Sequence, residues 1–249
     1  MQVADYVAEL EQHGPVLRAA AASAGLDARV PTCPDWQVRD LLAHVGRTHR
    51  WATSFVATGR TEPPRGDGEL AAAPGDDALL DWFTAGHGEL VRSLRTAPAQ
   101  LECWSFLPAP SPLAFWARRQ AHETAIHRVD AQLAAGQETT IGTRFAVDGI
   151  DELLLGFFSR RRSRLISDPP VVLGVRTTDG EDGAAWTVTV GPASREVTRG
   201  TARGDCVVSG PAASLYLLLW NRADVDTVDL SGDEQVLDLW RRKATVTWT

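Results

Sequence analysis

The spacing of apolar residues changes once along this chain of 249 residues, and that change constrains its fold class. In the first half, apolar residues recur every three or four positions, as in amphipathic helices. The segments with this pattern are 3–22, 36–55, 77–95 and 113–135. Short β-branched runs bounded by glycine then appear at 171–178, 184–190, 194–199 and 205–210. We therefore expect a helical first half and a second half built on a sheet.

The four helical segments predict a four-helix bundle with one long surface connection, the Gly- and Pro-rich residues 58–77. Thr32 or Asp35 is available to cap the second helix. A hinge near residues 134–146 leads into a helix over 147–166, and two more helices are expected at 212–222 and 233–242. The predicted domains are a bundle at 1–140 and a small α+β domain at 141–249, with a mostly antiparallel sheet and helices against one face.

Composition narrows the functional class. With 44% hydrophobic residues the chain can bury a core, and its longest apolar stretch falls far short of the roughly 20 residues that a membrane-spanning helix needs. The start lacks the pattern of a signal peptide, so we expect a cytoplasmic protein that does not bind membranes. The net charge of −7 disfavours a nucleic-acid partner. Cys33, Cys103 and Cys206 are odd in number and widely spaced, which favours reduced structural thiols.

Three residues have a pattern suited to metal binding. Glu123 and His127 are four apart on a predicted helix, about 40° apart around its axis, so both side chains can reach one ion. His44 on another helix could complete the set. Two imidazoles and one carboxylate leave an open position, as in catalytic zinc sites, although nickel, iron or manganese accept similar ligands. Taken alone, such a spacing is more often a coincidence on a helix than a metal site.

The other histidines are weaker ligand candidates. His122 could replace Glu123 as the ligand, but it points to another side of the helix. His49 is rotated away from the side of His44, and His13 and His87 are expected among exposed polar residues.

Two aspartates lie one helical turn from the proposed ligands. Asp130 follows His127 and Asp40 precedes His44, so either carboxylate could accept the outer N–H of an imidazole and fix its tautomer. Ion pairing on the helix surface is the alternative, which we prefer for Asp40 and leave open for Asp130. The sequence contains no nucleophile elbow, dinucleotide fingerprint or phosphate-binding loop.

Three segments together resemble a known family. They are VPTCPDWQVRDLLAHVGRTHRW, RRQAHETAIHRVDA and GPAASLYLLLWNRADVDTVDLSGD, in this order and over nearly the whole chain. They are similar to the mycothiol-dependent maleylpyruvate isomerase family within the DinB-like superfamily of four-helix metal proteins. The resemblance implies a DinB-like bundle, a C-terminal domain similar to the sterol carrier fold, and His44, Glu123 and His127 as ligands. It also implies mycothiol, the thiol of actinobacteria, which agrees with a chain holding one lysine against 24 arginines, a bias of GC-rich genomes.

The chemistry implied by the resemblance is thiol addition. A divalent metal lowers the pKa of a bound thiol, and the thiolate adds to a small electrophile, giving isomerisation or S-conjugation. Arg222, in the matching LLLWNR segment, is our candidate for holding an anionic substrate. A helix-end arginine at a domain interface is its alternative role. A metal-dependent hydrolase is one alternative function, and a binding protein with a metal-stabilised bundle is another; a monomer and a homodimer are equally compatible.

Two tryptophans and one cysteine have further possible roles. Trp104 and Trp116 flank a Pro-rich stretch and are expected to border the metal cavity, although tryptophans more often belong to the core. Cys33 invites a redox role, but packing before a helix explains it as well.

Overall fold

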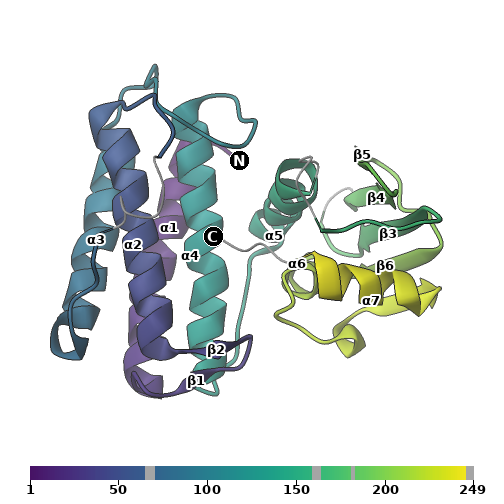
Figure 1. Ribbon diagram of the computed structural model, residues 1–249, viewed down its shortest axis with the longest axis horizontal. Coiled ribbons are helices and arrows are strands. Elements are labelled where there is room, and N and C mark those ends of the chain that lie inside the picture. Colours follow the sequence, from purple (N-terminus) through teal and green to yellow (C-terminus); the bar gives the residue numbers. More distant parts are fainter. Residues whose placement is uncertain (65–70, 159–163, 181–182, 245–249) are drawn as a thin grey trace. The chain divides into compact units, whose positions relative to one another are not determined.

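The computed structural model describes residues 1–64, 71–158, 164–180 and 183–244. Two compact units make up the chain, Met1–Thr139 and Thr140–Thr249. The first is helical and the second contains the large sheet, so the α+β architecture predicted from the sequence is confirmed (Figure 1). Within the described ranges, no helix is long and apolar enough to span a membrane.

Four long helices form the first unit. They are α1 (Val3–Ala24), α2 (Val38–Thr58), α3 (Asp76–Thr96) and α4 (Pro112–Ala134). The helices run side by side, with α1 in contact with α3 and α4, and α2 in contact with the same two (Figure 1). Each helix begins and ends within about three residues of its predicted bounds, which is the usual uncertainty at helix ends.

The start of α2 differs from the prediction. The backbone N–H of Gln37 donates to the Asp40 carboxylate at 2.9 Å, which is half of a capping box at this helix end. The prediction that Thr32 or Asp35 caps the helix is therefore wrong. Asp35 instead lies in β2 (Cys33–Gln37), which pairs antiparallel with β1 (Arg29–Val30) in a hairpin. This hairpin was not predicted, because Pro34 and Asp35 are unfavourable in strands.

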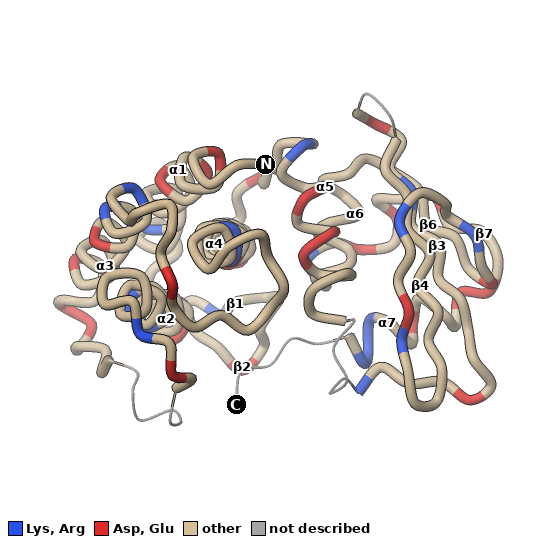
Figure 2. Tube along the Cα trace, turned by 90° about the horizontal axis from the view of Figure 1, so that it is seen from above, with Lys and Arg blue, Asp and Glu red and all other residues tan. Residues whose placement is uncertain are grey.

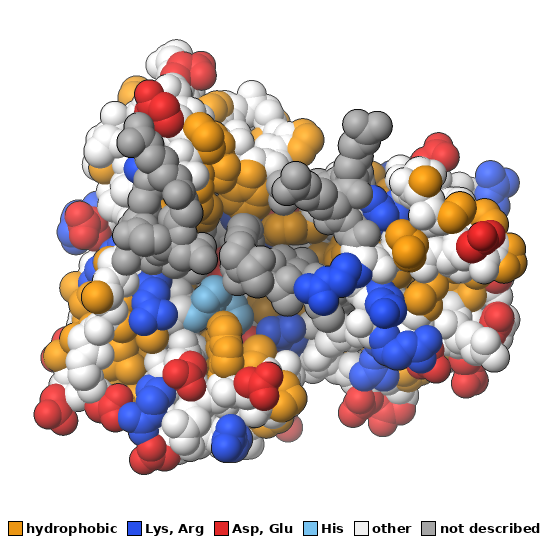
Figure 3. Space-filling view, viewed as in Figure 1, with side chains coloured by type: hydrophobic (Ala, Val, Ile, Leu, Met, Phe, Trp, Pro, Cys, Tyr) orange, Lys and Arg blue, Asp and Glu red, His pale blue; other side chains and the backbone are white. Residues whose placement is uncertain are grey.

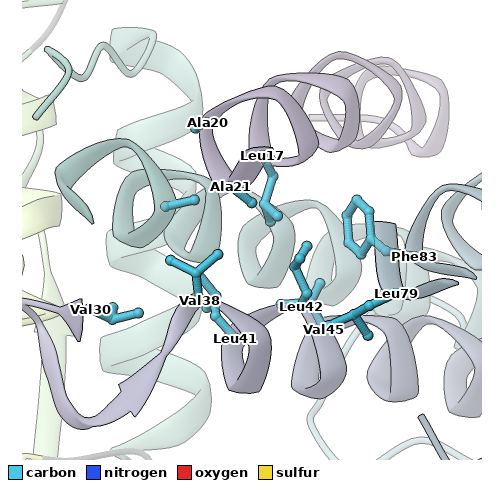
Figure 4. Packing of buried hydrophobic residues seen from close by; sticks show 11 residues of the cluster. Leu17, Ala20, Ala21, Val30, Val38, Leu41, Leu42, Val45, Leu79 and Phe83 are labelled. Atoms are coloured by element: carbon cyan, nitrogen blue, oxygen red, sulfur yellow. The ribbon is translucent and has the colours of Figure 1, made fainter. Parts of the chain in front are cut away.

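A hydrophobic cluster joins the hairpin to the bundle (Figure 4). Its buried members are Leu17, Ala20, Ala21, Val30, Val38, Leu41, Leu42, Val45, Leu79, Phe83 and Ala131. Val30 belongs to β1 and Ala131 to α4, so the first strand of the hairpin packs in the same core as the fourth helix. Burying each large aliphatic side chain contributes about 1.5–3 kcal/mol, which fixes the hairpin at this end of the bundle.

Helix α4 is buried on nearly all sides. Its start is well defined, because the Ser111 hydroxyl accepts from the Ala114 N–H at 3.1 Å and Pro112 occupies the first turn. The buried positions include many polar residues, namely Arg119, Gln120, His122, Glu123, Thr124, His127, Arg128 and Asp130. Buried polar groups are costly unless they are hydrogen-bonded, so the interior of the bundle must supply their partners.

The second unit is built on a five-stranded sheet in the order β5-β4-β3-β6-β7. Its strands are β3 (Val171–Thr177), β4 (Ala185–Val190), β5 (Arg195–Arg199), β6 (Cys206–Gly210) and β7 (Asp229–Gly232). All neighbours are antiparallel except β3 and β6, which are parallel. The sequence predicted the first four of these strands, but β7 was missed.

Three helices of the second unit lie on one side of this sheet (Figure 2). They are α5 (Thr143–Asp151), α6 (Ala212–Leu219) and α7 (Glu234–Lys243). Helix α5 continues as a π-helical turn, η2 (Glu152–Phe157). The predicted helix over 147–166 is therefore too long, because residues 164–166 are not helical; residues 159–163 lie outside the described ranges.

Candidate metal centre

The three predicted ligands meet between α2 and α4. The Oε1 atom of Glu123 lies 3.1 Å from Nε2 of His44 and 3.4 Å from Nε2 of His127. Each residue offers one donor atom, and the three atoms lie within 4.8 Å of one another. Among the residues that the structure describes, this is the one group of histidine, cysteine and carboxylate side chains with such geometry.

The spacing of these donors suits a tetrahedral ion. Zinc bonds of about 2.0–2.1 Å at tetrahedral angles place neighbouring donor atoms about 3.3–3.4 Å apart. The two distances from Glu123 Oε1 are 3.1 and 3.4 Å, which match this spacing, and all three donor atoms lie within 4.8 Å of one another. His122 is not a competing ligand in this arrangement, since its fully buried ring lies edge-on to Tyr6 at a centroid distance of 6.4 Å.

Arg119 binds the other oxygen of Glu123. Its Nη2 donates to Oε2 at 2.7 Å, and the arginine side chain is only 2% exposed. Burial would raise the pKa of Glu123, but hydrogen bonds from His127 and His44 and the charge of Arg119 hold it well below the ordinary value. Arg119 was not among the predicted site residues, although its four-residue spacing from Glu123 on a helix is a signal for such a pair.

Asp130 orients the ring of His127. Nδ1 of His127 lies 2.8 Å from Oδ2 of the fully buried Asp130, and a carboxylate only accepts, so Nδ1 carries the proton. Nε2 of the same ring then points to Glu123. Burial by itself lowers the pKa of His127, but the hydrogen bonds to Asp130 and Glu123 outweigh it and raise the pKa to about 9. Of the two roles that the sequence left open for Asp130, the structure shows the hydrogen bond to the outer N–H of His127.

Asp40 does not play the same role for His44. Its carboxylate accepts from the Gln37 N–H and caps α2. The side chain of His44 is 22% exposed, and the other five histidines are buried. Histidine atoms reach the surface of the helical unit in Figure 3. The group of three ligands therefore reaches solvent on the side of His44.

Trp36 is the aromatic residue next to the candidate ligands. Its ring stacks on His127 at a centroid distance of 6.0 Å and lies 4.9 Å from the ring of His44. The prediction that Trp104 and Trp116 border the cavity is not supported. In the described part of the chain, the ring contacts of Trp104 and Trp116 are with Trp51, Phe55, Phe106, Phe115 and each other, and not with a candidate ligand.

The remaining histidines are core residues rather than ligands. His13 and His87 were expected to be exposed but are 5% and 7% exposed. Burial lowers the pKa of His13 to about 3 and also lowers that of His87, whose Nε2 donates to the Leu10 carbonyl at 2.8 Å. Both positions continue apolar stripes, with Leu10 three residues before His13, so helical periodicity could have predicted their burial.

His49 is also a neutral core residue. It is fully buried, and its Nε2 lies 2.9 Å from the Thr124 hydroxyl. That hydroxyl donates to the Gln120 carbonyl, so the imidazole is the donor to Thr124. Burial, helped by the neighbouring His87, holds the pKa of His49 well below its ordinary value.

Arg222 belongs to the second unit, just beyond α6. It is half-buried, and its Nη1 donates to the Trp220 carbonyl at 2.7 Å. This hydrogen bond holds one guanidinium nitrogen of Arg222 at the end of α6. Cys33, Cys103 and Cys206 are not joined in disulfides, and Cys33 packs against the hydrophobic cluster of the bundle, which supports its structural role.

Comparisons with known proteins agree with this architecture. Residues 7–132 match the model of the mycothiol maleylpyruvate isomerase N-terminal domain, and residues 144–239 match that of the MDMPI C-terminal domain. Similar solved structures are a mycothiol-dependent maleylpyruvate isomerase, at 15% identity, and a histidine-to-alanine mutant of a mycothiol-dependent maleylpyruvate isomerase, at 14%. Each match has a TM-score of 0.62 and covers 93% of both chains. No curated protein matches the chain.

Proposed function

Because the chain belongs to the mycothiol maleylpyruvate isomerase family, we propose that it is a metal-dependent isomerase that uses mycothiol to isomerise a small unsaturated acid. The observation that carries the proposal is the sharing of one carboxylate oxygen of Glu123 by Nε2 of His44 and Nε2 of His127. A buried carboxylate between two imidazoles on facing helices has the donor set and spacing of a catalytic divalent-metal site.

In this proposal, His44, Glu123 and His127 hold the ion, with zinc as the first choice. A bound divalent cation would lower the pKa of a thiol and so supply a thiolate at neutral pH. Asp130 keeps the Nε2 lone pair of His127 directed at the site, and Arg119 keeps Glu123 from rotating. The side of His44 that reaches solvent admits the thiol and the substrate.

The isomerisation itself requires only reversible addition of the thiol. A bond forms between sulfur and one carbon of the double bond, and the π electron pair moves onto the conjugated carbonyl oxygen. Rotation about the resulting single bond follows. The carbon–sulfur bond then breaks and its electrons leave with sulfur, while the pair returns from oxygen to restore the double bond in its trans form. We assign Arg222 to the substrate carboxylate, because a planar guanidinium binds such a group through two hydrogen bonds.

The decisive test is the thiol dependence of turnover. Zinc-loaded protein is incubated with maleylpyruvate, with and without a catalytic amount of mycothiol, and the products are followed by NMR. We expect the trans isomer only when thiol is present, with thiol unconsumed, and loss of turnover in His44→Ala. Consumption of thiol into a stable adduct would indicate an S-transferase instead. Formation of hydrolysis products without thiol would indicate the hydrolase alternative.

A spectroscopic test addresses the metal and thiol without a substrate. The cobalt-loaded protein is titrated with mycothiol, and its visible absorption is recorded. A new sulfur-to-cobalt band is expected if the thiol enters the coordination sphere. An unchanged spectrum at saturating thiol would contradict the proposed role of the metal. Absence of bound metal after incubation with zinc would contradict both the isomerase and the hydrolase.

A further inference from the structure

We propose that Thr32 is a positioning residue for the metal centre, acting on His127 through Asp130. Thr32 lies in the turn of the β1–β2 hairpin, far from either residue in sequence. The inference rests on the proposed metal site and adds to it an element outside the two ligand-bearing helices. Its consequence is that the affinity for metal depends on a hydroxyl that does not touch the ion.

The hydrogen bonds form a continuous chain. The Thr32 hydroxyl donates to Oδ1 of Asp130 at 2.5 Å, and Nδ1 of His127 donates to Oδ2 of the same carboxylate at 2.8 Å. The two oxygens of Asp130 are thus bound on opposite edges, which fixes the plane of the carboxylate. A partner of this kind determines both the tautomer and the orientation of a ligand imidazole.

The hairpin is held firmly enough to act as a support. Val30, two residues before Thr32, is fully buried in the cluster that includes Ala131 of α4. On the other side of the turn, the N–H of Val38 donates to the Ala28 carbonyl at 2.9 Å. Thr32 therefore follows a strand that is anchored in the core beside α4.

The same hairpin contacts the ligand ring directly. Trp36 of β2 is nearly parallel to the ring of His127, at 27°, with a centroid distance of 6.0 Å. Thr32 acts on the Nδ1 edge of that ring through Asp130, while Trp36 covers its face. Two independent contacts from one hairpin thus restrain His127 in both rotation and tilt.

The test is the zinc affinity of hairpin variants, measured by competition with a chromophoric chelator. Thr32→Val keeps the shape of the side chain and removes the hydroxyl. We expect about a tenfold loss of affinity, at the lower end of the range for an outer-shell hydrogen bond. Thr32→Ser restores the donor and should recover most of that affinity. In the Asp130→Asn background, Thr32→Val should have little further effect, because Thr32 acts through the carboxylate.

A spectroscopic readout separates positioning from general stability. In the cobalt-loaded protein, the Nδ1–H proton of His127 gives a paramagnetically shifted resonance, and it should exchange with water faster in Thr32→Val. The control is Thr53→Val, which removes a buried hydroxyl that donates to the His49 carbonyl and should leave both the affinity and the exchange unchanged.

Three outcomes would overturn the inference: a Thr32→Val affinity equal to that of the wild type, an equal loss in Thr53→Val, or no recovery with serine. If the wild-type protein fails to bind zinc, the proposed metal centre itself is wrong. The two failures are therefore distinguished by the wild-type measurement.

Discussion

Glu123 is bound on both of its carboxylate oxygens, and the partners have different roles. Oε1 faces the two imidazoles, whereas Oε2 accepts from the buried guanidinium of Arg119. A carboxylate buried at 5% exposure would be costly without a nearby cation. Arg119 supplies that charge and leaves Oε1 free to serve as a single-oxygen ligand.

We expect Arg119→Met to destabilise the metal-free protein. Removing one partner leaves a buried charge uncompensated, a change that costs about 3–5 kcal/mol in comparable pairs. Chemical denaturation followed by circular dichroism measures the free energy of unfolding. The double variant Arg119→Met/Glu123→Leu removes both charges and should recover much of the loss. A single variant with wild-type stability would show that the pair contributes little to folding.

The pH dependence of zinc binding follows from His127. Its pKa is raised to about 9 in the metal-free protein, so the imidazole is protonated at neutral pH and zinc must displace the proton. The association constant should therefore rise about tenfold per pH unit between pH 7 and 9 and then level off. Calorimetry in buffers with different ionisation enthalpies measures the proton released, expected to be about one per zinc. Binding without proton release would contradict the raised pKa.

The same shift predicts how the metal-free protein responds to pH. A folded-state pKa above the unfolded value of about 6.5 stabilises the fold fully below pH 6.5, and this contribution is lost as the pH rises to about 9. Denaturation midpoints of the wild type should therefore fall between pH 6.5 and 9. His127→Gln should show a smaller fall, because it lacks the titrating group. An equal fall in both proteins would assign the effect to other residues.

Spacing along a helix explains which site residues could be predicted. Glu123, His127 and Asp130 lie within two turns of α4, so their relation follows from helical geometry alone. His44 required a match to a family pattern, since no local rule places it opposite Glu123. Thr32 could not be predicted, because its contact with Asp130 spans 98 residues and depends on a hairpin that the sequence does not reveal.

At the scale of elements, helices and strands with a long, regular apolar pattern were predicted well, and short ones were missed. The long helices carry several turns of apolar periodicity, whereas β1 has two residues and β7 has four. Such short strands form because neighbours pair with them, and their own composition contributes little. The candidate site depends on both kinds of element, since α2 and α4 carry the proposed ligands and the hairpin carries Thr32 and Trp36.

Close packing between α1 and α3 depends on a glycine. A methyl group at Gly14 would lie 2.2 Å from Nε2 of His87, whose ring is held by the Leu10 carbonyl. We expect Gly14→Ala to destabilise the protein by about 1–3 kcal/mol through overpacking. This effect outweighs the advantage of about 1 kcal/mol that alanine has over glycine within a helix. Thermal or chemical denaturation measures the difference.

Gly88 provides the matched control for that substitution. It also lies within α3, but a methyl group there would meet only the Arg92 guanidinium, at 3.8 Å. Gly88→Ala should therefore leave the protein unchanged or stabilise it by up to about 1 kcal/mol. If both substitutions change the stability equally, helix propensity and not the contact with His87 determines the effect of Gly14→Ala.

At the scale of the whole molecule, the two units have separate parts of the proposed reaction. His44, Glu123 and His127 all belong to Met1–Thr139, so one unit contains every proposed ligand. Arg222 belongs to Thr140–Thr249 and is assigned to the anionic substrate. The change in apolar spacing along the sequence predicts two units of different architecture, because a helical bundle and a sheet require different periodicities.

The division of roles predicts a specific kinetic result for Arg222→Ala. Zinc affinity should remain that of the wild type, because no proposed ligand is changed. The kcat/KM for a carboxylate substrate should fall by about tenfold or more, because a charged hydrogen bond is lost. Arg222→Lys retains the charge without the planar pair of donors and should recover only part of the activity. Arg241→Ala removes another arginine of the second unit, one paired with exposed Asp224, and serves as the control. Equal kcat/KM in the Arg222→Ala and Arg241→Ala variants would leave Arg222 with a structural role alone, consistent with its hydrogen bond to the Trp220 carbonyl at the end of α6.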